Sequence, residues 1–443
     1  MGTQPIGKLL LQYAIPAIIA MTASSLYNMV DSIFIGHGVG PLAISGLAIT
    51  FPLMNLAAAF GSLVGVGAST LVSVKLGQKD YATAQNILGN VVTLNFIIGI
   101  GFSILTLLFL DPILYFFGAS PDTISYARDY MVIILLGNVI THMYLGLNAL
   151  LRASGHPQKA MTATITTVII NTILDPIFIY LFHWGIQGAA IATMLSQVVG
   201  GLLPVFYFLN RNNTSRIHLC RPRFEGKVLL NACINGSSEL MTNLSMSLVN
   251  ILYNYQLLRF AGEDGVAAYG VIMYASFLFV AVFVGYAVGS APIVSYHYGA
   301  NNRKEVNNLY RKSLKLIGVV AVGMTIGSMF IIPHVARFFV GYDENLLILT
   351  TRAFRLYGLS FLIMGFNVYA SSFFTALGDG VTSALISFLR TLLFQVAAVL
   401  LLPLLLGIDG IWLAVTAAEL AALLVSIGLF ITRDQQFHYR KAE

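Results

Sequence analysis

The segment AISGLAITFPLMNLAAAFGSLVGVGASTLVSVKLGQKD (43–80) contains no charged residue before Lys75. A helix of about twenty apolar residues crosses the hydrocarbon core of a bilayer, whereas a strand of a transmembrane barrel needs only about ten. The uncharged run is long enough for a membrane-spanning helix and too long for a barrel strand. It therefore predicts an all-α integral membrane protein.

The rest of the chain has a composition that agrees with this segment. Of the 443 residues, 57% are hydrophobic and 9% are charged, whereas a soluble protein has about 25% charged residues. The net charge is +6, but the basic residues lie in short segments between apolar runs. We therefore expect membrane lipid as a partner and no nucleic acid.

Apolar runs recur along the whole chain and predict twelve transmembrane helices. Their expected bounds are 8–35, 44–75, 82–110, 123–152, 158–182, 186–210, 227–259, 266–298, 304–332, 345–377, 381–406 and 411–432.

The chain also repeats itself at an offset of about 222 residues, as transporters with parallel repeats do. Segment 43–80 aligns with GVAAYGVIMYASFLFVAVFVGYAVGSAPIVSYHYGANN (265–302), and NALLRASGHP (148–157) aligns with SSFFTALGDG (371–380). Because six helices separate the copies, both start on the same side of the membrane. The predicted fold is two six-helix lobes related by a parallel pseudo-twofold repeat.

We expect an N-terminal lobe at 1–210, a polar cytoplasmic linker at 211–226 and a C-terminal lobe at 227–443. Most of the 24 Lys and Arg residues lie at the termini or in even-numbered loops. The positive-inside rule then predicts that both termini of this multi-pass membrane protein are cytoplasmic.

Two carboxylates interrupt apolar runs, Asp31 in SSLYNMVDSIFIG and Asp175 in NTILDPIFIY. A charge at the bilayer centre costs about 2.5–3.5 kcal/mol on insertion scales, so such a residue indicates function by default. Each lies on a polar helix face. The residues that precede them at helical spacing are Ser24, Tyr27 and Asn28 for Asp31, and Thr164, Thr167 and Asn171 for Asp175.

Further oxygen atoms are expected near these carboxylates. Pro176 follows Asp175 and removes a backbone donor, which frees the Thr172 carbonyl. Ala189 and Thr193 lie one turn apart on the sixth helix. Oxygen ligands suit Na⁺, and a carboxyl group shielded from water also suits a proton. The alternative is that Asn171 and Thr193 only hold helices together.

The seventh helix carries a polar stripe that cannot face lipid. Its members are Asn235, Glu239, Asn243, Ser247, Asn250 and Asn254. We expect the stripe, with Glu239 as a cation-attracting or proton-carrying group, to line a cleft between the lobes; a helix-packing seam is the alternative. Tyr130 and Asn148 are predicted to share one face of the fourth helix and to line the same cleft.

Arg390 and Glu419 lie near the middles of the last two predicted helices. An unpaired charge there would be very costly, so they predict a structural ion pair, with a role in transport as the alternative. The sequence has no GxxxxGK[ST], HExxH or GxSxG motif. We therefore expect neither an enzyme nor a cofactor, and energy from an ion gradient or a separate subunit.

Several motifs together resemble the MATE (multidrug and toxic compound extrusion) family. They are YNMVDSIFIGHGVGPLAISG, KLGQKDYATA, LRASGHPQKA and NTILDPIFIY. The resemblance covers essentially the whole chain and is closest to the DinF-like and MepA-like bacterial branch.

The resemblance implies a V-shaped pair of helix bundles that export drugs, often cationic and aromatic, in exchange for Na⁺ or H⁺. It implies a cation site in the N-terminal lobe, at Asp31, Asn171, Asp175, Ala189 and Thr193. It also implies cavity positions at Tyr27, Tyr130 and Asn148 and an acidic coupling position at Glu239. Some members carry an aspartate on the tenth helix, and GFNVYASSFF has none, which favours coupling through Asp31 and Asp175.

We therefore expect a monomeric secondary antiporter that exports small-molecule drugs or organic cations, with H⁺ or Na⁺ as the coupling ion. Tyr27, Asn28, Tyr130, Asn148, Glu239 and Asn243 are the expected substrate-cavity residues. A flippase for a lipid-linked saccharide is the nearest alternative, but it would need more cationic residues in the cleft. A membrane-embedded enzyme or a receptor has no supporting motif.

Overall fold

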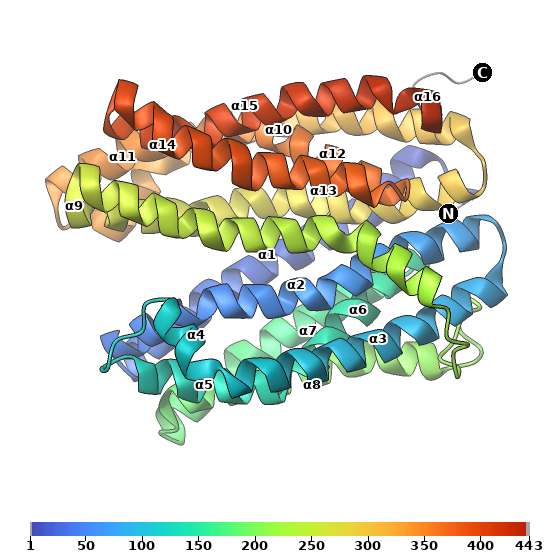
Figure 1. Ribbon diagram of the computed structural model, residues 1–443, viewed down its shortest axis with the longest axis horizontal. Helices are drawn as coiled ribbons and strands as arrows, with labels where there is room; N and C mark the ends of the chain where they lie inside the picture. The colour runs from blue at the N-terminus through green and yellow to red at the C-terminus, as the bar shows by residue number, and fades with distance from the viewer. Residues whose placement is uncertain (1, 440–443) are drawn as a thin grey trace.

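The computed structural model describes residues 2–439, which form helices joined by short turns, with no strand among them (Figure 1). The first half of the chain contains α1 (Ile6–Gly38), α2 (Pro41–Gly77), α3 (Tyr81–Leu108), α4 (Leu110–Phe116), α5 (Ile124–Leu136), α6 (Asn138–Ala153), α7 (Pro157–Pro176), η1 (Ile177–Leu181) and α8 (Gly185–Leu209). The second half contains α9 (Gly226–Gly299), α10 (Arg303–Val340), α11 (Glu344–Gly358), α12 (Phe361–Ala376), α13 (Gly380–Phe388), η2 (Leu389–Leu393), α14 (Phe394–Leu406), α15 (Ile408–Thr432) and α16 (Asp434–Phe437).

Helix α9 folds back on itself and so crosses the membrane twice. Its 74 residues include Gly262, whose φ of 62° and ψ of −152° interrupt the helix. Tyr269, which follows the break, donates from its hydroxyl to Oδ1 of Asn250, which precedes it, at 2.7 Å. A straight helix rises about 1.5 Å per residue and could not bring these two residues together. Glycine adopts this positive φ without strain.

The expected twelve membrane crossings are confirmed. Within residues 2–439, nine helices are long and apolar enough to span a membrane, and counting each bent pair, α5–α6 and α11–α12, as one span gives eleven. The second crossing of α9 is the twelfth. The structure corrects the predicted fourth and tenth helices, which are bent by 56° and 46°. The third ends at Leu108, before the short α4, and not at residue 110.

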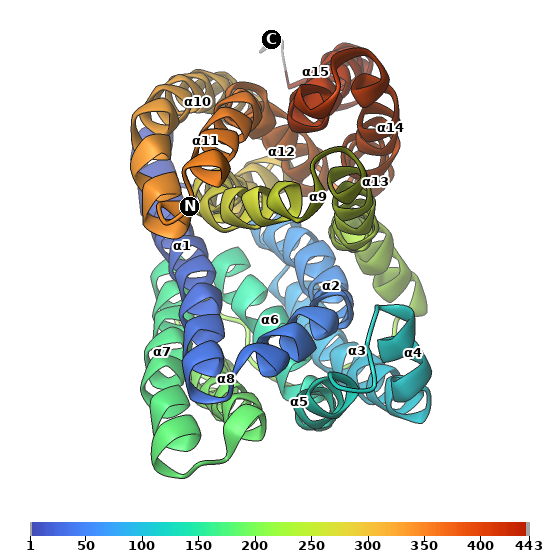
Figure 2. The same ribbon diagram turned by 90° about the vertical axis from the view of Figure 1, so that its left-hand side faces the viewer.

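The helices form two sets, and α1 runs along both of them. Figure 2 shows α2 to α8 in one set and α9 to α15 in the other. Ile6, Leu9 and Tyr13, near the start of α1, pack in one apolar cluster with residues of α9, α10 and α12. Ile35, near its end, packs in another cluster with residues of α2, α5 and α8. Helix α1 therefore connects the two sets over its length.

The internal repeat is visible in two equivalent helix caps. Asp80 Oδ1 accepts from the backbone N–H of Thr83 at 3.2 Å and starts α3. Asn302, which the sequence repeat aligns with Asp80, accepts from the N–H of Glu305 at 3.3 Å and starts α10. Side chains of this kind stabilise a helix by satisfying one of its free N–H groups. The same local chemistry therefore begins the third helix of each half.

Helices α2 and α9 approach each other closely through glycine. A Cβ atom added at Gly67 would lie 1.8 Å from the Ala232 carbonyl oxygen, and one at Gly236 would lie 1.8 Å from the Leu63 carbonyl oxygen. Small residues of this kind allow the backbones of membrane helices to pack together. This contact holds the two sets together at the start of α9.

The segment between α8 and α9 is bound to α3. Asn90 Nδ2 donates to the Arg223 carbonyl at 2.8 Å, and the Arg223 N–H donates to Asn86 Oδ1 at 2.8 Å. This segment lies at the same end of the molecule as both termini (Figure 1). The connection between the halves is therefore an ordered strap at that end.

Candidate functional site

Asp31 and Asp175 meet inside the first set of helices. Asp31 is 6% exposed on α1, and Asp175 is fully buried at the end of α7. Their carboxyl groups lie within hydrogen-bonding reach of each other. Neither belongs to an ion pair among the five that join described residues. The sequence placed these carboxylates on separate helices, and the fold brings them together without a basic partner.

Asn171 and Thr193 complete a polar cluster around this pair. Asn171 Nδ2 lies 3.4 Å from Asp175 Oδ1 and 3.3 Å from Thr193 Oγ1, which joins α7 to α8. Ala189 is fully buried one turn before Thr193 and packs in an apolar cluster. Because its side chain is a methyl group, it can offer only its backbone carbonyl oxygen.

Three oxygen atoms of this cluster have no hydrogen-bond partner in the described part of the chain. They are Asp31 Oδ1, Asn171 Oδ1 and Asp175 Oδ2, and all are buried. Buried polar atoms in proteins are nearly always hydrogen-bonded or bound to an ion. The unsatisfied atoms are all acceptors, so a proton on the carboxyl groups, a bound cation or a water molecule would satisfy them.

The backbone next to Asp175 is irregular. Helix α7 ends at Pro176, and Ile177–Leu181 form a turn of π-helix. Proline removes one backbone donor, and π-turns occur often at functional sites. The irregular turn adjoins the carboxylate cluster and allows local rearrangement there.

Tyr27 and Tyr130 adjoin the carboxylate cluster. Both hydroxyl groups lie near Thr193. Tyr130 is 1% exposed and belongs to α5. The two tyrosines close the cluster from the α1 and α5 sides.

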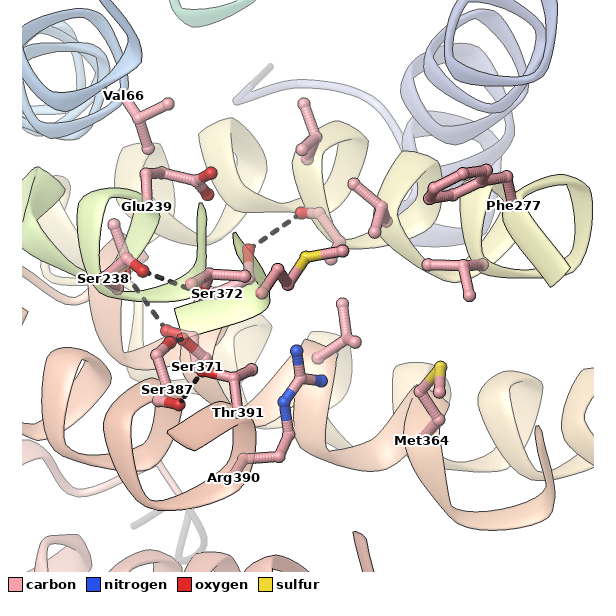
Figure 3. Close-up of a pocket in the computed structure, with 18 of the residues that line it drawn as sticks. Val66, Ser238, Glu239, Phe277, Met364, Ser371, Ser372, Ser387, Arg390 and Thr391 are labelled. Atoms are coloured by element: carbon pink, nitrogen blue, oxygen red, sulfur yellow. Dashed lines mark hydrogen bonds between the residues drawn. The ribbon is translucent and has the colours of Figure 1, made fainter. Parts of the chain in front are cut away.

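A separate cavity of about 240 Å³ lies mainly in the second set of helices. Glu239 and Arg390 extend toward it from opposite walls, and Ser238, Ser371 and Ser387 form a hydroxyl-rich side (Figure 3). Tyr253 and Tyr269 also line it, with parallel rings whose centroids are 5.2 Å apart. The cavity therefore combines charged groups with aromatic surface, as small-molecule sites do.

Six residues were expected to line the substrate cavity. Of these, Glu239 lines the cavity described above, and the other five lie elsewhere. Asn28 is exposed on α1, and Asn243 donates to the Glu239 carbonyl of its own helix at 2.8 Å. Asn148 Nδ2 donates to the Ala160 carbonyl at 3.1 Å and so joins α6 to α7. Tyr27 and Tyr130 belong to the carboxylate cluster instead.

The expectation that Tyr130 and Asn148 share one helix face is wrong. The predicted fourth helix breaks at Gly137, and the two pieces are bent by 56°. A break between two residues removes the fixed angular relation that an intact helix would give them. Tyr130 therefore faces Asp31, while Asn148 packs against α7.

Arg390 and Glu419 lie close together at the cavity. Arg390 Nη1 is 3.9 Å from Glu419 Oε1, and Glu419 is 2% exposed. Glu419 Oε2 accepts a stronger contact from Asn367 Nδ2 at 2.7 Å. Arg390 belongs to η2, a second π-turn.

Sequence reasoning missed several residues of the cavity. Arg152 reaches it from α6 and donates a short hydrogen bond to Asn148 Oδ1. In the sequence this arginine follows an apolar run and has the pattern of a topology determinant. The predicted helices 227–259 and 266–298 place a turn around Gly262, but the sequence analysis did not infer that Tyr253 and Tyr269 stack across this turn.

Comparison with known families matches both halves of the chain. The sequence model described as MatE matches residues 16–177 and 240–400. The two matched segments have nearly the same length and cover equivalent helices of the two sets, which agrees with the internal repeat.

Individual relatives match over nearly the full length. The Multidrug export protein MepA of Staphylococcus aureus (strain MSSA476) is 24% identical over 440 residues, covering 97% of this chain and 95% of the relative. A solved structure described as the outward-facing conformation of a multidrug resistance MATE family transporter of the MOP superfamily has a TM-score of 0.91. It is 25% identical and covers 97% of this chain and 96% of its own.

A third similar structure is that of a transporter from Pyrococcus furiosus. The structure, described as a MOP superfamily transporter from Pyrococcus furiosus whose binding pocket of reverse polarity suggests a different function, has a TM-score of 0.91 and 25% identity. It covers 97% of this chain and 96% of its own.

Proposed function

The chain belongs to the MatE family, and from this premise we propose that it is a secondary active multidrug efflux antiporter. It exports small molecules, often cationic and aromatic, in exchange for H⁺ or Na⁺. The observation that carries this proposal is the set of buried, unsatisfied oxygen atoms around Asp31 and Asp175. If an ion gradient is to drive export, these oxygen atoms have to bind the ion in one state of the transporter and release it in another.

Ion binding would act through α1 and the irregular end of α7. Two carboxylates in a dry site repel each other unless a proton or Na⁺ lies between them. Occupation would draw Asp31 toward Asp175, Asn171 and Thr193, and release would allow α1 to separate from α7. A shift of an equilibrium from 1:99 to 99:1 needs about 5.5 kcal/mol of differential binding, which neutralisation of a buried carboxylate pair is large enough to supply.

The cavity would hold the exported molecule. Glu239 offers a carboxylate to a cation, and the faces of Tyr253 and Tyr269 attract positive charge. Met246, Met273 and Met364 also line the cavity. Flexible methionine side chains repack around different ligands, which suits an exporter of many drugs.

The proposed organisation has an N-terminal lobe (1–210), a linker (211–226) and a C-terminal lobe (227–443). Both termini and the linker would lie on the cytoplasmic side of the bacterial inner membrane, because the basic residues are concentrated at that end. The protein would work as a monomer in membrane lipid, without a cofactor and without nucleic acid.

A flippase for a lipid-linked saccharide is the second candidate. Arg152 and Arg390 in the cavity are the cations that a pyrophosphate group would need. Glu239 and Glu419 lie in the same cavity and would repel such a group, so the antiporter is the better-supported function.

Purified protein in proteoliposomes tests the proposal. A fluorescent cationic dye should be transported when a pH gradient or a Na⁺ gradient is imposed, and collapse of that gradient should stop transport. Dye movement driven by neither gradient would remove the antiport function. Turnover of a lipid-linked saccharide by the same vesicles would instead favour the flippase.

A further inference from the structure

Arg390 is a charged group in the cavity that antiport itself does not require. Its guanidinium group points into the cavity from η2 (Figure 3). The Nη1 atom is buried and has no hydrogen-bond partner among the described residues. Guanidinium groups in a dry environment normally donate to several acceptors, so this one has donor capacity left for a ligand.

The neighbouring carboxylate does not use that capacity. Glu419 Oε1 is 3.9 Å from Arg390 Nη1, which is too long for a hydrogen bond. Glu419 is instead held by Asn367, whose Nδ2 donates to Glu419 Oε2 at 2.7 Å and to the Glu419 carbonyl at 2.8 Å. Ser426 in turn donates to Asn367 Oδ1 at 3.1 Å. This network holds Glu419 at the cavity wall beside Arg390.

The opposite wall carries the complementary charge. Glu239 belongs to no ion pair among the described residues, although it lies within electrostatic reach of Arg390 and Arg152. Arg152 already donates to Asn148 Oδ1. Two arginines and two glutamates therefore line one cavity, and Arg390 and Glu239 extend into it from opposite walls.

From this arrangement we infer that Arg390 binds a carboxylate, or a similarly compact anionic group, of the exported molecule while Glu239 binds its cationic group. The substrate class is then an aromatic zwitterion, with its ring system against Tyr253 and Tyr269. A planar guanidinium forms two parallel hydrogen bonds to a carboxylate. The inference rests on the proposed export function and specifies what that function selects.

The irregular backbone around Arg390 supports a binding role. Thr391, in the π-turn Leu389–Leu393, donates from Oγ1 to the Ser387 carbonyl at the end of α13 at 2.7 Å. The first half of the chain has its own π-turn directly after Asp175. Each half thus places a charged residue at a break in the corresponding helix, with a carboxylate in one half and a guanidinium in the other.

A matched pair of dyes tests the inference. Rhodamine 110 carries a free carboxylate and a cationic xanthylium ring, and rhodamine 123 is its methyl ester, which lacks the negative charge. Binding of each dye to the detergent-purified full-length protein is measured by fluorescence polarisation, and transport of each is measured in proteoliposomes. The variants are Arg390→Gln, Arg390→Lys and the control Arg352→Gln, which breaks an exposed ion pair with Asp409 away from the cavity.

Arg390→Gln should weaken rhodamine 110 binding by about tenfold or more, which is the size of a lost charge-assisted hydrogen bond. It should leave rhodamine 123 binding unchanged or stronger, which also demonstrates that the variant is folded. Arg390→Lys should recover part of the rhodamine 110 affinity, because it keeps the charge without the planar fork. Arg352→Gln should behave as wild type with both dyes.

The opposite outcomes are distinct. If Arg390→Gln weakens both dyes equally, or if neither dye changes, Arg390 does not bind an anionic group and the inference is overturned. If wild type transports rhodamine 123 but does not bind rhodamine 110, the inference fails while the export function stands. Transport of neither dye under either gradient would overturn both.

Discussion

Gly77 on α2 and Gly299 on α9 each pack against the backbone of the other's helix. A Cβ atom at Gly77 would lie 2.1 Å from the Tyr296 carbonyl oxygen, and one at Gly299 would lie 2.2 Å from the Val74 carbonyl oxygen. The sequence repeat aligns these two glycines, and it also aligns Val74 with Tyr296. The contact is therefore nearly symmetric, and it closes the two sets of helices against each other at the end that carries the basic turns.

Gly77→Ala and Gly299→Ala should each force this contact open. Real Cβ atoms do not approach backbone oxygen within 3.0 Å, so the helices must separate, at a cost of about 1–3 kcal/mol. We expect a lower thermal unfolding temperature in detergent and slower transport. The double variant should cost less than the sum of the two, because one separation relieves both clashes.

Gly323→Ala is the matched control, because a Cβ atom there meets nothing within 4 Å. It should leave transport unchanged and should slightly stabilise α10, by about 0.5–1 kcal/mol. Equal behaviour of Gly77→Ala and Gly323→Ala would contradict a tight contact at this end.

Asp31→Asn and Asp175→Asn should each abolish gradient-driven efflux while leaving membrane insertion intact. An amide removes the charge that binds a proton or Na⁺ but keeps the size of the side chain. Dye efflux from vesicles measures transport, and protein abundance in the membrane fraction measures insertion. Asp264→Asn, a change of an exposed aspartate, is the control and should transport as wild type does. Wild-type drug resistance in both cluster variants would refute the proposed ion site.

Glu239→Gln should lower the affinity for a purely cationic dye such as rhodamine 123 by about tenfold, since a charge-assisted contact is lost. Fluorescence polarisation with purified protein measures this. Glu263→Gln is the control, because Glu263 is exposed beside the turn at Gly262. Unchanged affinity in Glu239→Gln would move the cation-binding position elsewhere in the cavity.

Asn90→Ala should loosen the strap between α8 and α9. The lost hydrogen bond to the Arg223 carbonyl is worth about 1 kcal/mol. We expect a small decrease in the unfolding temperature and faster trypsin cleavage after Arg223. Asn212→Ala, at an exposed position of the same segment, should change neither. Cleavage at the same rate in both variants would mean that α3 does not hold the strap.

The membrane crossings and the internal repeat could be predicted from sequence because they depend on long-range composition. Uninterrupted apolar runs set the helices, and the repeat that aligns Asp80 with Asn302 agrees with two equivalent caps in the structure. The clustering of Asp31 with Asp175 was also predictable, since polar faces in membrane helices have to turn inward.

The bends could not be predicted, because they lack the usual signal. The 56° bend at Gly137 and the 46° bend after Gly358 contain no proline, and isolated glycines are common in straight membrane helices. These bends decide which cavity a side chain reaches. They separated Tyr130 from Asn148, and no residue pattern on one helix could reveal that Arg152 from the first half joins a cavity of the second.

Helix α1 packs against both halves of the molecule. It is 33 residues long, a rod of about 50 Å, with Tyr13 wedged against Gly289 near one end and Asp31 in the carboxylate cluster near the other. Under the proposed mechanism, a tilt of α1 caused by ion binding would also move the half that contains the cavity. In that mechanism, the ion and the drug would influence each other through α1 without being in direct contact.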